Sequence, residues 1–330
     1  MTTHTPTRPR PTTEATASTV RRALGSEELW MKLAAPVALV VLSVVFGLLN
    51  PRFLSWPSIS SMLADSTIPI LLALGATFAV SLAGIDLSLA ATVALGSVTM
   101  ATAYQSGLPL VVCCAIALFT GLAVGAVNGT FIGWVRIPDF IVTLGSLSVV
   151  MGLSLIISQG KPVAIAERSL TALSTMSVAG IRVNFLVAIA VALVLHVVLF
   201  RTRFGTHLLA VGDNADAAKA MGLKVPRIKL AGYMICGGMG GIAAIMLTSY
   251  IGSSQPATNT DYLLKAIAAV VLGGVSLFGG RATIYGPVIG AVLLTVLQSG
   301  LTLLGVSAFY SPLVIGIVVI AAATLMRGRK

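Results

Sequence analysis

The sequence predicts an all-α integral membrane protein with about ten transmembrane helices. Of its 330 residues, 57% are hydrophobic and only 9% are charged, and the mean hydropathy is +1.00. A soluble domain carries roughly 25% charged residues. Long apolar stretches recur along the chain, and ten of the 21 Lys and Arg residues lie in the polar tail and in one long polar loop. Composition, apolar stretches and charge distribution together predict the fold class and the orientation in the bilayer.

The chain begins with a polar tail. Residues 1–29 are rich in Thr, Pro, Ala and Arg and lack apolar periodicity, so we expect a flexible cytoplasmic tail ahead of a transmembrane domain at 30–330. It does not resemble a cleaved signal peptide, because the apolar run that follows is long and has no small-residue cleavage site.

Ten apolar stretches follow, each near the roughly 17 to 25 residues that a bilayer requires. The predicted spans cover residues 32–49, 60–83, 87–104, 108–134, 140–158, 185–200, 230–251, 262–277, 285–304 and 309–326. Trp30 and Trp56 lie beside span starts, as interfacial aromatic residues do. The segment 159–183 is too polar to cross, and glycines at 273, 274, 279 and 280 are expected to make the eighth span short and breakable.

The basic residues predict that both termini are cytoplasmic. An even number of spans puts both termini on one side, and with that side inside, 16 of the 21 basic residues are cytoplasmic. The remaining five, Arg52, Lys161, Arg168, Arg182 and Lys265, are outside. Cytoplasmic loops carry the excess of Lys and Arg in membrane proteins. The formal charge of +11 is therefore attributed to orientation rather than to nucleic-acid binding, for which no recognition motif is present.

The polar loop 201–230, between the sixth and seventh spans, is the most informative stretch. It carries six basic residues and is placed in the cytoplasm. Asp213 or Asn214 can cap a short helix over 215–221, and Gly222 can supply the left-handed residue that ends it. A short helix on a tether suits a groove in another protein.

No catalytic, metal or cofactor site is predicted. The phosphate-binding GxxxxGK[ST] loop is absent, and Cys113, Cys114 and Cys236 show neither a disulfide framework nor a metal spacing. His196 is the one histidine inside a predicted span, close to its cytoplasmic end, where a polar residue at a helix terminus is the alternative to a functional one. Asp86 is the best acidic candidate, with helix capping as its alternative role.

Four segments carry a family resemblance: GIDLSLAATVALG (84–96), VNGTFIGWVRIPDFIVTLGSLSVVMGLSLI (127–156), GTHLLAVGDNADAAKAMGLKV (205–225) and AIAAVVLGGVSLFGGRATIYGPVIGAVLL (266–294). In this order they look like the permease of ribose-type sugar importers of the ATP-binding-cassette superfamily. The similarity extends from about residue 31 to the carboxyl end. Within the polar loop, Asp216-Ala217-Ala218 followed by Gly222 matches the EAAxxxG pattern of importer permeases, with Asp in place of Glu.

The resemblance implies a monosaccharide permease in the bacterial plasma membrane. Two such subunits, identical or paralogous, would line the path, and an extracytoplasmic sugar-binding protein would deliver the sugar. The polar loop would dock on a cytoplasmic ATPase, which holds the ATP and Mg, while this chain binds no cofactor. The residues assigned to this coupling loop are Gly205, Gly212, Asp213, Asn214, Asp216, Ala217, Ala218, Lys219, Gly222 and Lys224.

Neutral sugars need hydrogen-bonding groups without buried charge. Polar positions in or near the spans that could line a substrate path are Asp86, Ser88, Asn128, Thr143, Ser146 and Gln298. For each of them, an interhelical hydrogen bond is the alternative role. Gly121, Gly125 and Gly129, spaced by four, indicate close helix packing.

Two other functions compete with the importer permease. One is an ion-coupled secondary transporter of a small polar solute, which would work without an ATPase. The other is an intramembrane enzyme, for which the sequence shows no nucleophile with a placed base.

Overall fold

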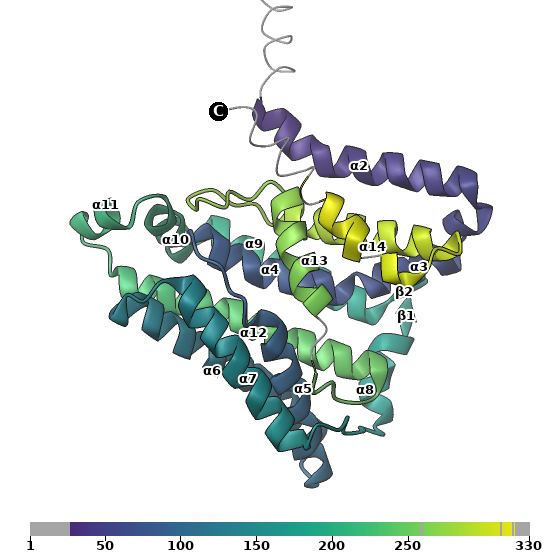
Figure 1. The fold of residues 1–330 in the computed structure, drawn as a ribbon, viewed down its shortest axis with the longest axis horizontal. Coiled ribbons are helices and arrows are strands. Elements are labelled where there is room, and N and C mark those ends of the chain that lie inside the picture. Colours follow the sequence, from purple (N-terminus) through teal and green to yellow (C-terminus); the bar gives the residue numbers. More distant parts are fainter. Residues whose placement is uncertain (1–26, 258–259, 311, 319, 321–330) are drawn as a thin grey trace, which may run out of the picture.

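The protein is a bundle of helices (Figure 1). This computed structural model describes residues 27–257, 260–310, 312–318 and 320. In chain order the elements are α2 (Glu27–Leu49), η1 (Pro51–Leu54), α3 (Trp56–Asp65), α4 (Thr67–Ser81), α5 (Leu89–Gln105), α6 (Leu110–Thr130), η2 (Phe131–Val135), α7 (Asp139–Ser158), α8 (Arg168–Thr175), β1 (Ser177–Val178), β2 (Ile181–Arg182), α9 (Val183–Arg201), α10 (Arg203–Asp213), α11 (Ala215–Ala220), α12 (Val225–Ile251), α13 (Thr260–Leu272), α14 (Tyr285–Leu303) and η3 (Ala308–Tyr310).

Within the described part of the chain, six helical segments are long and apolar enough to cross a bilayer. They coincide with the predicted spans two, four, five, six, seven and nine, and are Trp56–Ser81, Leu110–Val135, Asp139–Ser158, Val183–Arg201, Val225–Ile251 and Tyr285–Leu303. The shorter apolar helix Leu33–Leu49 and α5 fall on the first and third predicted spans. A total of ten spans therefore stays a prediction.

The eighth predicted span is shorter than the sequence indicated. Helix α13 has 13 residues, about 20 Å at 1.5 Å per residue, against a hydrocarbon core of about 30 Å. After it the chain runs as a loop to Ile284, and Gly274, Gly279 and Gly280 all have positive φ. A helix cannot continue through left-handed residues, which corrects the predicted boundary at 277. Of the tenth predicted span, residues 312–318 are helical, and 321–326 lie outside the described residues.

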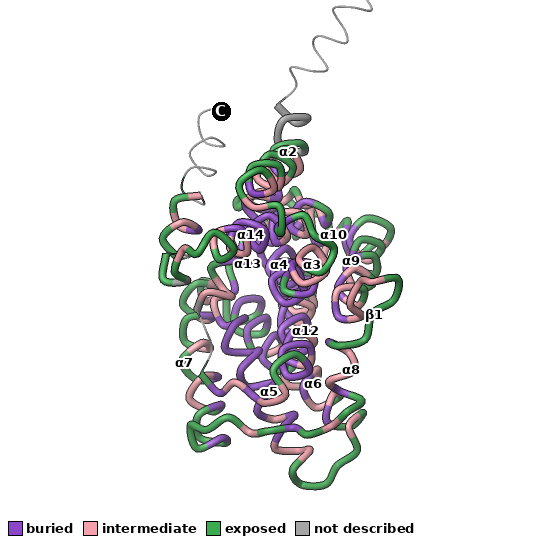
Figure 2. Tube along the Cα trace, turned by 90° about the vertical axis from the view of Figure 1, so that its right-hand side faces the viewer, coloured by how far each residue is buried: buried purple, intermediate pink, exposed green. Residues whose placement is uncertain are grey.

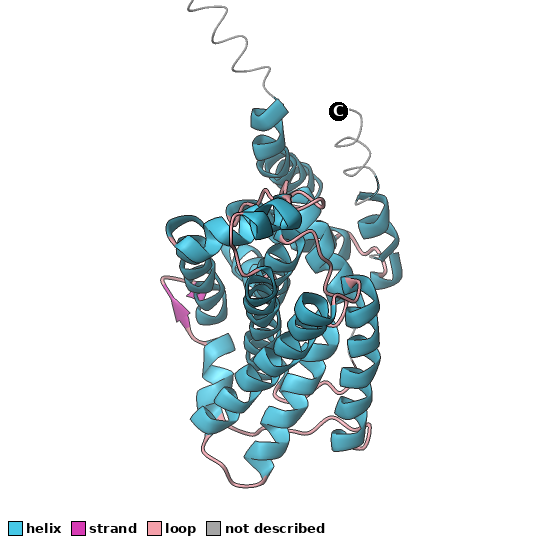
Figure 3. Cartoon of the chain, turned by 90° about the vertical axis from the view of Figure 1, so that its left-hand side faces the viewer, coloured by secondary structure: helices cyan, strands magenta, loops and turns pink. Residues whose placement is uncertain are grey.

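Two smaller features also differ from the prediction. Helix α2 begins at Glu27, so the last three residues of the predicted tail are helical, and residues 1–26 lie outside the described part. The segment 159–183, for which the sequence predicts only that it does not cross, contains helix α8 and a β-hairpin (Figure 3). Ala179 and Gly180 both have positive φ, the conformation that a two-residue hairpin turn requires.

Helix α4 lies at the centre of the molecule. Each of its residues from Thr67 to Ser81 is buried, and α12, α13, α14 and α9 pack around it. Figure 2 shows this buried centre surrounded by exposed outer helices. The outer helices α2, α6, α7 and α9 expose large apolar side chains, among them Val40, Phe119, Ile156 and Leu193. Such surfaces are suited to lipid.

Helices α6 and α12 pack backbone to backbone. A Cβ on Gly121 would collide with the carbonyl oxygen of Gly237, and a Cβ on Gly125 would lie 2.8 Å from the Cα of Met234. The predicted close packing at glycines spaced by four is confirmed, and α12 is the partner helix. Small residues are what lets membrane helices approach this closely, because lipid supplies no hydrophobic force between them.

The ends of the helices lie on two opposite sides of the molecule. On one side, the backbone N–H of Gly280 donates to the carbonyl of Ser81 at 3.1 Å, close to α10 and α11. On the opposite side, Asn50 donates to the carbonyl of Leu303 at 3.1 Å, and Ser60 donates to the carbonyl of Gly180 at 2.8 Å. The basic loop 201–230 thus lies on the first side, which the charge distribution predicts to be cytoplasmic.

Replacing Gly125 with Ala should destabilise the protein by about 1–3 kcal/mol, because the methyl group has to push α6 away from the α12 backbone. The matched variant is Gly145→Ala on α7, where a Cβ meets nothing within 4 Å and where Ala gains helix propensity of at most about 1 kcal/mol. Thermal unfolding of the two variants in detergent measures the difference. Equal unfolding temperatures would contradict the close-packing argument.

Candidate functional site

The polar loop folds as the sequence predicts. Asn214 caps α11, since its Oδ1 accepts the backbone N–H of Ala217 at 2.9 Å. The chain then turns at Gly222, whose φ of +85° is left-handed. Of the two residues predicted as caps, Asn214 caps α11, whereas Asp213 is the last residue of α10.

The residues assigned to this loop divide into an exposed set and a buried set. The exposed set faces away from the bundle and consists of Asp213, Asn214, Asp216, Ala217, Lys219, Gly222 and Lys224. Gly205, Gly212 and Ala218 are buried against the chain itself. The buried set therefore holds the loop in place, and the exposed set, with Met221 at 71% exposure, forms the surface available to a partner.

The loop rests on the end of the central helix. A Cβ on Gly212 would collide with the carbonyl oxygen of Ser81, the last residue of α4. The same carbonyl accepts the backbone N–H of Gly280. The end of α4 is thus held between the α10–α11 segment and the loop that follows α13.

Most of the predicted substrate-path residues form a separate hydrogen-bonded cluster near this side. The hydroxyl of Ser88 donates to Asp86 at 2.6 Å, and the amide of Asn128 donates to the Ser88 hydroxyl at 2.9 Å. Ser146 donates in turn to Asn128. These contacts join α5, α6 and α7, and Asp86, Ser88 and Asn128 are almost fully buried.

Thr143 also makes structural contacts. Its hydroxyl donates to the carbonyls of Ile85, at 3.1 Å, and of Asp139, at 2.9 Å. The backbone N–H of Ile85 donates to the Asp139 carboxylate. Burial raises the pKa of the Asp86 carboxyl above its ordinary value, although hydrogen bonds from Ser88 oppose that shift. The cluster corresponds to the interhelical alternative, and it does not line the cavity described next.

A polar cavity of about 620 Å³ lies toward the opposite side of the molecule. Six helices line it, α3, α4, α9, α12, α13 and α14, with a rim at η1. The lining residues are Arg52, Ser55, Ser58, Ser61, Met62, Ala64, Asp65, Thr67, Ile68, Pro69, Asn184, Met246, Tyr250, Tyr262, Lys265, Thr295, Gln298, Ser299, Thr302 and Leu303. Arg52, Ser55 and Leu303 are exposed, so the cavity reaches the surface on the side of the Asn50–Leu303 contact.

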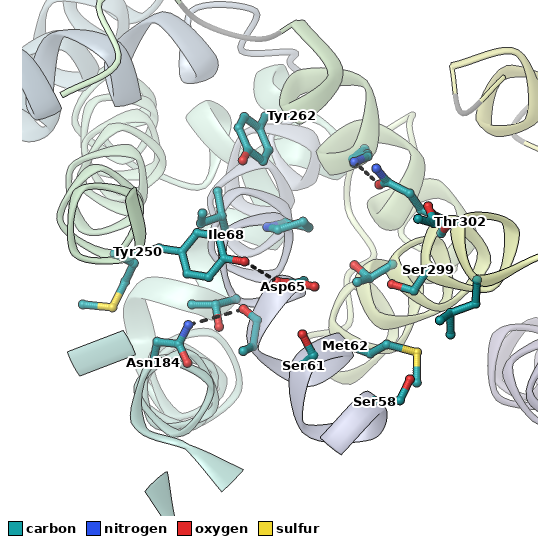
Figure 4. Close-up of a pocket in the computed structure, with 18 of the residues that line it drawn as sticks. Ser58, Ser61, Met62, Asp65, Ile68, Asn184, Tyr250, Tyr262, Ser299 and Thr302 are labelled. Carbon is teal, nitrogen blue, oxygen red and sulfur yellow. Dashed lines mark hydrogen bonds between the residues drawn. The ribbon is translucent and has the colours of Figure 1, made fainter. Parts of the chain in front are cut away.

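Two hydrogen-bonded pairs of side chains lie on the walls of the cavity. The Tyr250 hydroxyl donates to Asp65 at 3.1 Å, and the Lys265 ammonium donates to the side-chain carbonyl of Gln298. Figure 4 shows Tyr250 and Tyr262 on one wall, with Ser299 and Thr302 on the wall opposite.

Of the predicted substrate-path residues, Gln298 alone lines this cavity. The charge distribution counts Lys265 among the outside basic residues, although it falls inside the predicted span 262–277, and in the structure it lies in α13 with 9% exposure. Asp65 received no role, although it falls inside the second predicted span. The signal was present in both cases, because ionisable residues inside a span are rare and are commonly functional.

His196 lies on α9 beside Phe200. Its ring is 4.9 Å from that of Phe200, and the side chain is exposed on α9. Within the described residues, no group of three or more His, Cys, Asp and Glu could hold a metal ion.

Comparison with known proteins gives a family and close relatives. The family model for the branched-chain amino acid transport system permease component matches residues 58–323. The ribose import permease protein of Bacillus subtilis (strain 168) is 36% identical, over 94% of this chain and 98% of its own length. The D-allose transport system permease protein of Escherichia coli (strain K12) is 32% identical, over 90% of this chain and 92% of its own. The autoinducer 2 import system permease protein of Salmonella typhi is 33% identical, over 87% of this chain and 82% of its own length. No solved structure matches the chain.

If the Asp86 cluster is structural, Asn128→Ala should destabilise the protein by about 1–3 kcal/mol, because it leaves the Ser146 hydroxyl without its acceptor and the buried Ser88 hydroxyl without its donor. Ser148→Ala on α7, whose hydroxyl bonds only within its own helix at the exposed surface, should change stability by less than about 0.5 kcal/mol. Thermal unfolding in detergent again makes the comparison. A fully stable Asn128→Ala variant would reopen the functional interpretation of this cluster.

Proposed function

The chain belongs to the branched-chain amino acid transport system permease family, and we propose that it is the permease subunit of an importer that carries a monosaccharide across the bacterial plasma membrane. Its relatives include permeases for ribose and for D-allose, and they match nearly all of this chain. Six apolar helices among the described residues agree with a multi-pass membrane protein. The proposal places ATP and Mg on a separate ATPase of the ATP-binding-cassette type. An extracytoplasmic binding protein and a second permease subunit complete the assembly.

The observation that carries this proposal is the capped helix α11. Its Asn214 cap and the left-handed Gly222 give it defined ends, and its outer face is exposed beside several basic residues. A short helix with small side chains can enter a groove on a partner. We assign that groove to the ATPase.

The same contacts suggest how ATP hydrolysis acts on the substrate path. The α10–α11 segment rests on Ser81 at one end of α4, and Thr67, Ile68 and Pro69 at the other end line the cavity. A displacement of α11 by the ATPase is therefore applied to a helix that forms the cavity wall. Differential contact with two states of the ATPase would bias the permease between two conformations.

The ion-coupled carrier remains the competing function, because Asp65 and Lys265 are charges inside predicted spans, as carriers that move protons have. The two functions differ in their partner. Purification of the tagged chain from its native host after crosslinking should recover an ATPase at fixed stoichiometry.

That association should be lost in Ala217→Arg, which puts a long charged side chain on the exposed face of α11. The matched control is Ala166→Arg, which is exposed and lies next to Ile165, bonded to Gly252 on the opposite side of the molecule. Repeated recovery of intact permease without an ATPase would favour the ion-coupled carrier.

A backbone test is available at Gly222. Gly222→Val should reduce ATP-dependent uptake strongly with normal membrane insertion, because a β-branched residue is strained at φ of +85°. Gly222→Asn should retain most of the uptake, since Asn tolerates the left-handed region. Equal uptake by the two variants would show that the turn after α11 does not matter for coupling.

A further inference from the structure

We propose that the polar cavity between α3, α4, α9, α12, α13 and α14 is a binding site for one uncharged sugar, formed within a single permease subunit. The inference rests on the proposed function and adds to it a location and a set of contact residues. The volume of the cavity, about 620 Å³, falls within the roughly 300–1,000 Å³ of small-molecule sites.

The first argument is the free-energy cost of placing charged side chains inside a membrane protein. Asp65 lies in Trp56–Ser81, a helical segment long and apolar enough to cross the bilayer, and Lys265 is 9% exposed on α13. Such charges are expensive in a membrane protein and are retained mainly where they contact a ligand, water or each other. The two are close enough for their charges to interact, and together they carry no net charge.

The second argument is hydrogen-bonding capacity beyond what the protein uses. A carboxylate offers about four acceptor positions and an ammonium three donors, more than Tyr250 and Gln298 occupy. Among the residues that the structure describes, the buried Thr67 hydroxyl has no hydrogen-bond partner, and Thr67 lines the cavity. These groups are suited to a ligand with several hydroxyls, each of which both donates and accepts.

The third argument concerns charge. A neutral sugar leaves the Asp65 and Lys265 charges balanced. An anionic sugar, such as a sugar phosphate, would bring negative charge toward Asp65, and a cationic ligand would bring positive charge toward the buried Lys265. A neutral ligand meets neither repulsion, and Arg52 adds its positive charge at the exposed rim. The exposed ring of Tyr250 and the half-buried ring of Tyr262 offer apolar faces to the sugar ring.

Side-specific cysteine labelling tests the site. Ser61 on α3 and Ser299 on α14 both line the cavity (Figure 4), and Ser106 is exposed in the connection between α5 and α6. Each is replaced by Cys in the complete transporter in intact cells and labelled with a membrane-impermeant maleimide, with the unmodified chain as the blank. The probe is whichever of D-ribose, D-allose and other neutral monosaccharides the unmodified transporter takes up.

The transported sugar should slow labelling of Ser61→Cys and Ser299→Cys and leave labelling of Ser106→Cys unchanged. D-ribose 5-phosphate should protect none of them. Uptake of a sugar without protection of either cavity cysteine would overturn the site and leave the proposed function standing. Protection of Ser106→Cys to the same extent would also overturn it, because the effect would then be global.

A second measurement tests whether Lys265 contacts the sugar. In the Ser61→Cys background, Lys265→Met should raise the sugar concentration that gives half protection by about tenfold, the effect of losing one hydrogen bond to a charged group. Lys161→Met, an exposed lysine on the same side, is the matched control and should leave that concentration unchanged. Recovery of the ATPase with both variants shows that they assemble. Equal half-protection concentrations in the two variants would remove Lys265 from the site.

If the unmodified complex takes up no neutral monosaccharide in an ATP-dependent way, the proposed function fails and the site assignment fails with it. That outcome is distinct from uptake without protection, which removes the site alone.

Discussion

The backbone contact between α6 and α12 is the constraint on which the rest of the bundle depends. With no side chain at Gly121, Gly125 and Gly237, the two helices come together at the distance of their main chains. Packing of this kind stabilises membrane helices through van der Waals contact, where apolar burial does not. It fixes α12, and α12 in turn packs on α4 and α5. The position of the buried α4, and of everything arranged around it, follows from this contact.

Helix α4 links the two ends of the molecule. Its Ser81 end is held by the α10–α11 segment and the Gly280 loop, and its Thr67 end forms part of the cavity wall. All of its side chains are buried, so it cannot move without displacing its neighbours. A tightly packed element of this kind transmits a displacement rather than absorbing it.

The polar groups of the helices separate into two sets with different physical roles. Asp86, Ser88, Asn128 and Ser146 bond to one another and tie helices together, and among the described residues the buried Asp86 Oδ2 has no hydrogen-bond partner. The groups around Asp65 and Lys265 line a cavity that reaches the surface, and they retain capacity for a ligand. A polar residue in a span is therefore interpretable only when its partners are known.

The sequence by itself determined the membrane class, most of the apolar segments, the capped helix α11 and the glycine stripe of α6, because hydropathy, capping and residue size act over a few neighbouring positions. Only the tertiary structure decided that α13 is too short to span and that Lys265 turns inward. It also decided which polar residues meet. Asp65 and Tyr250 are 185 residues apart, and Lys265 and Gln298 are 33 apart. Such pairs arise from how the helices pack around α4 and α12, and no local pattern in the chain records that arrangement.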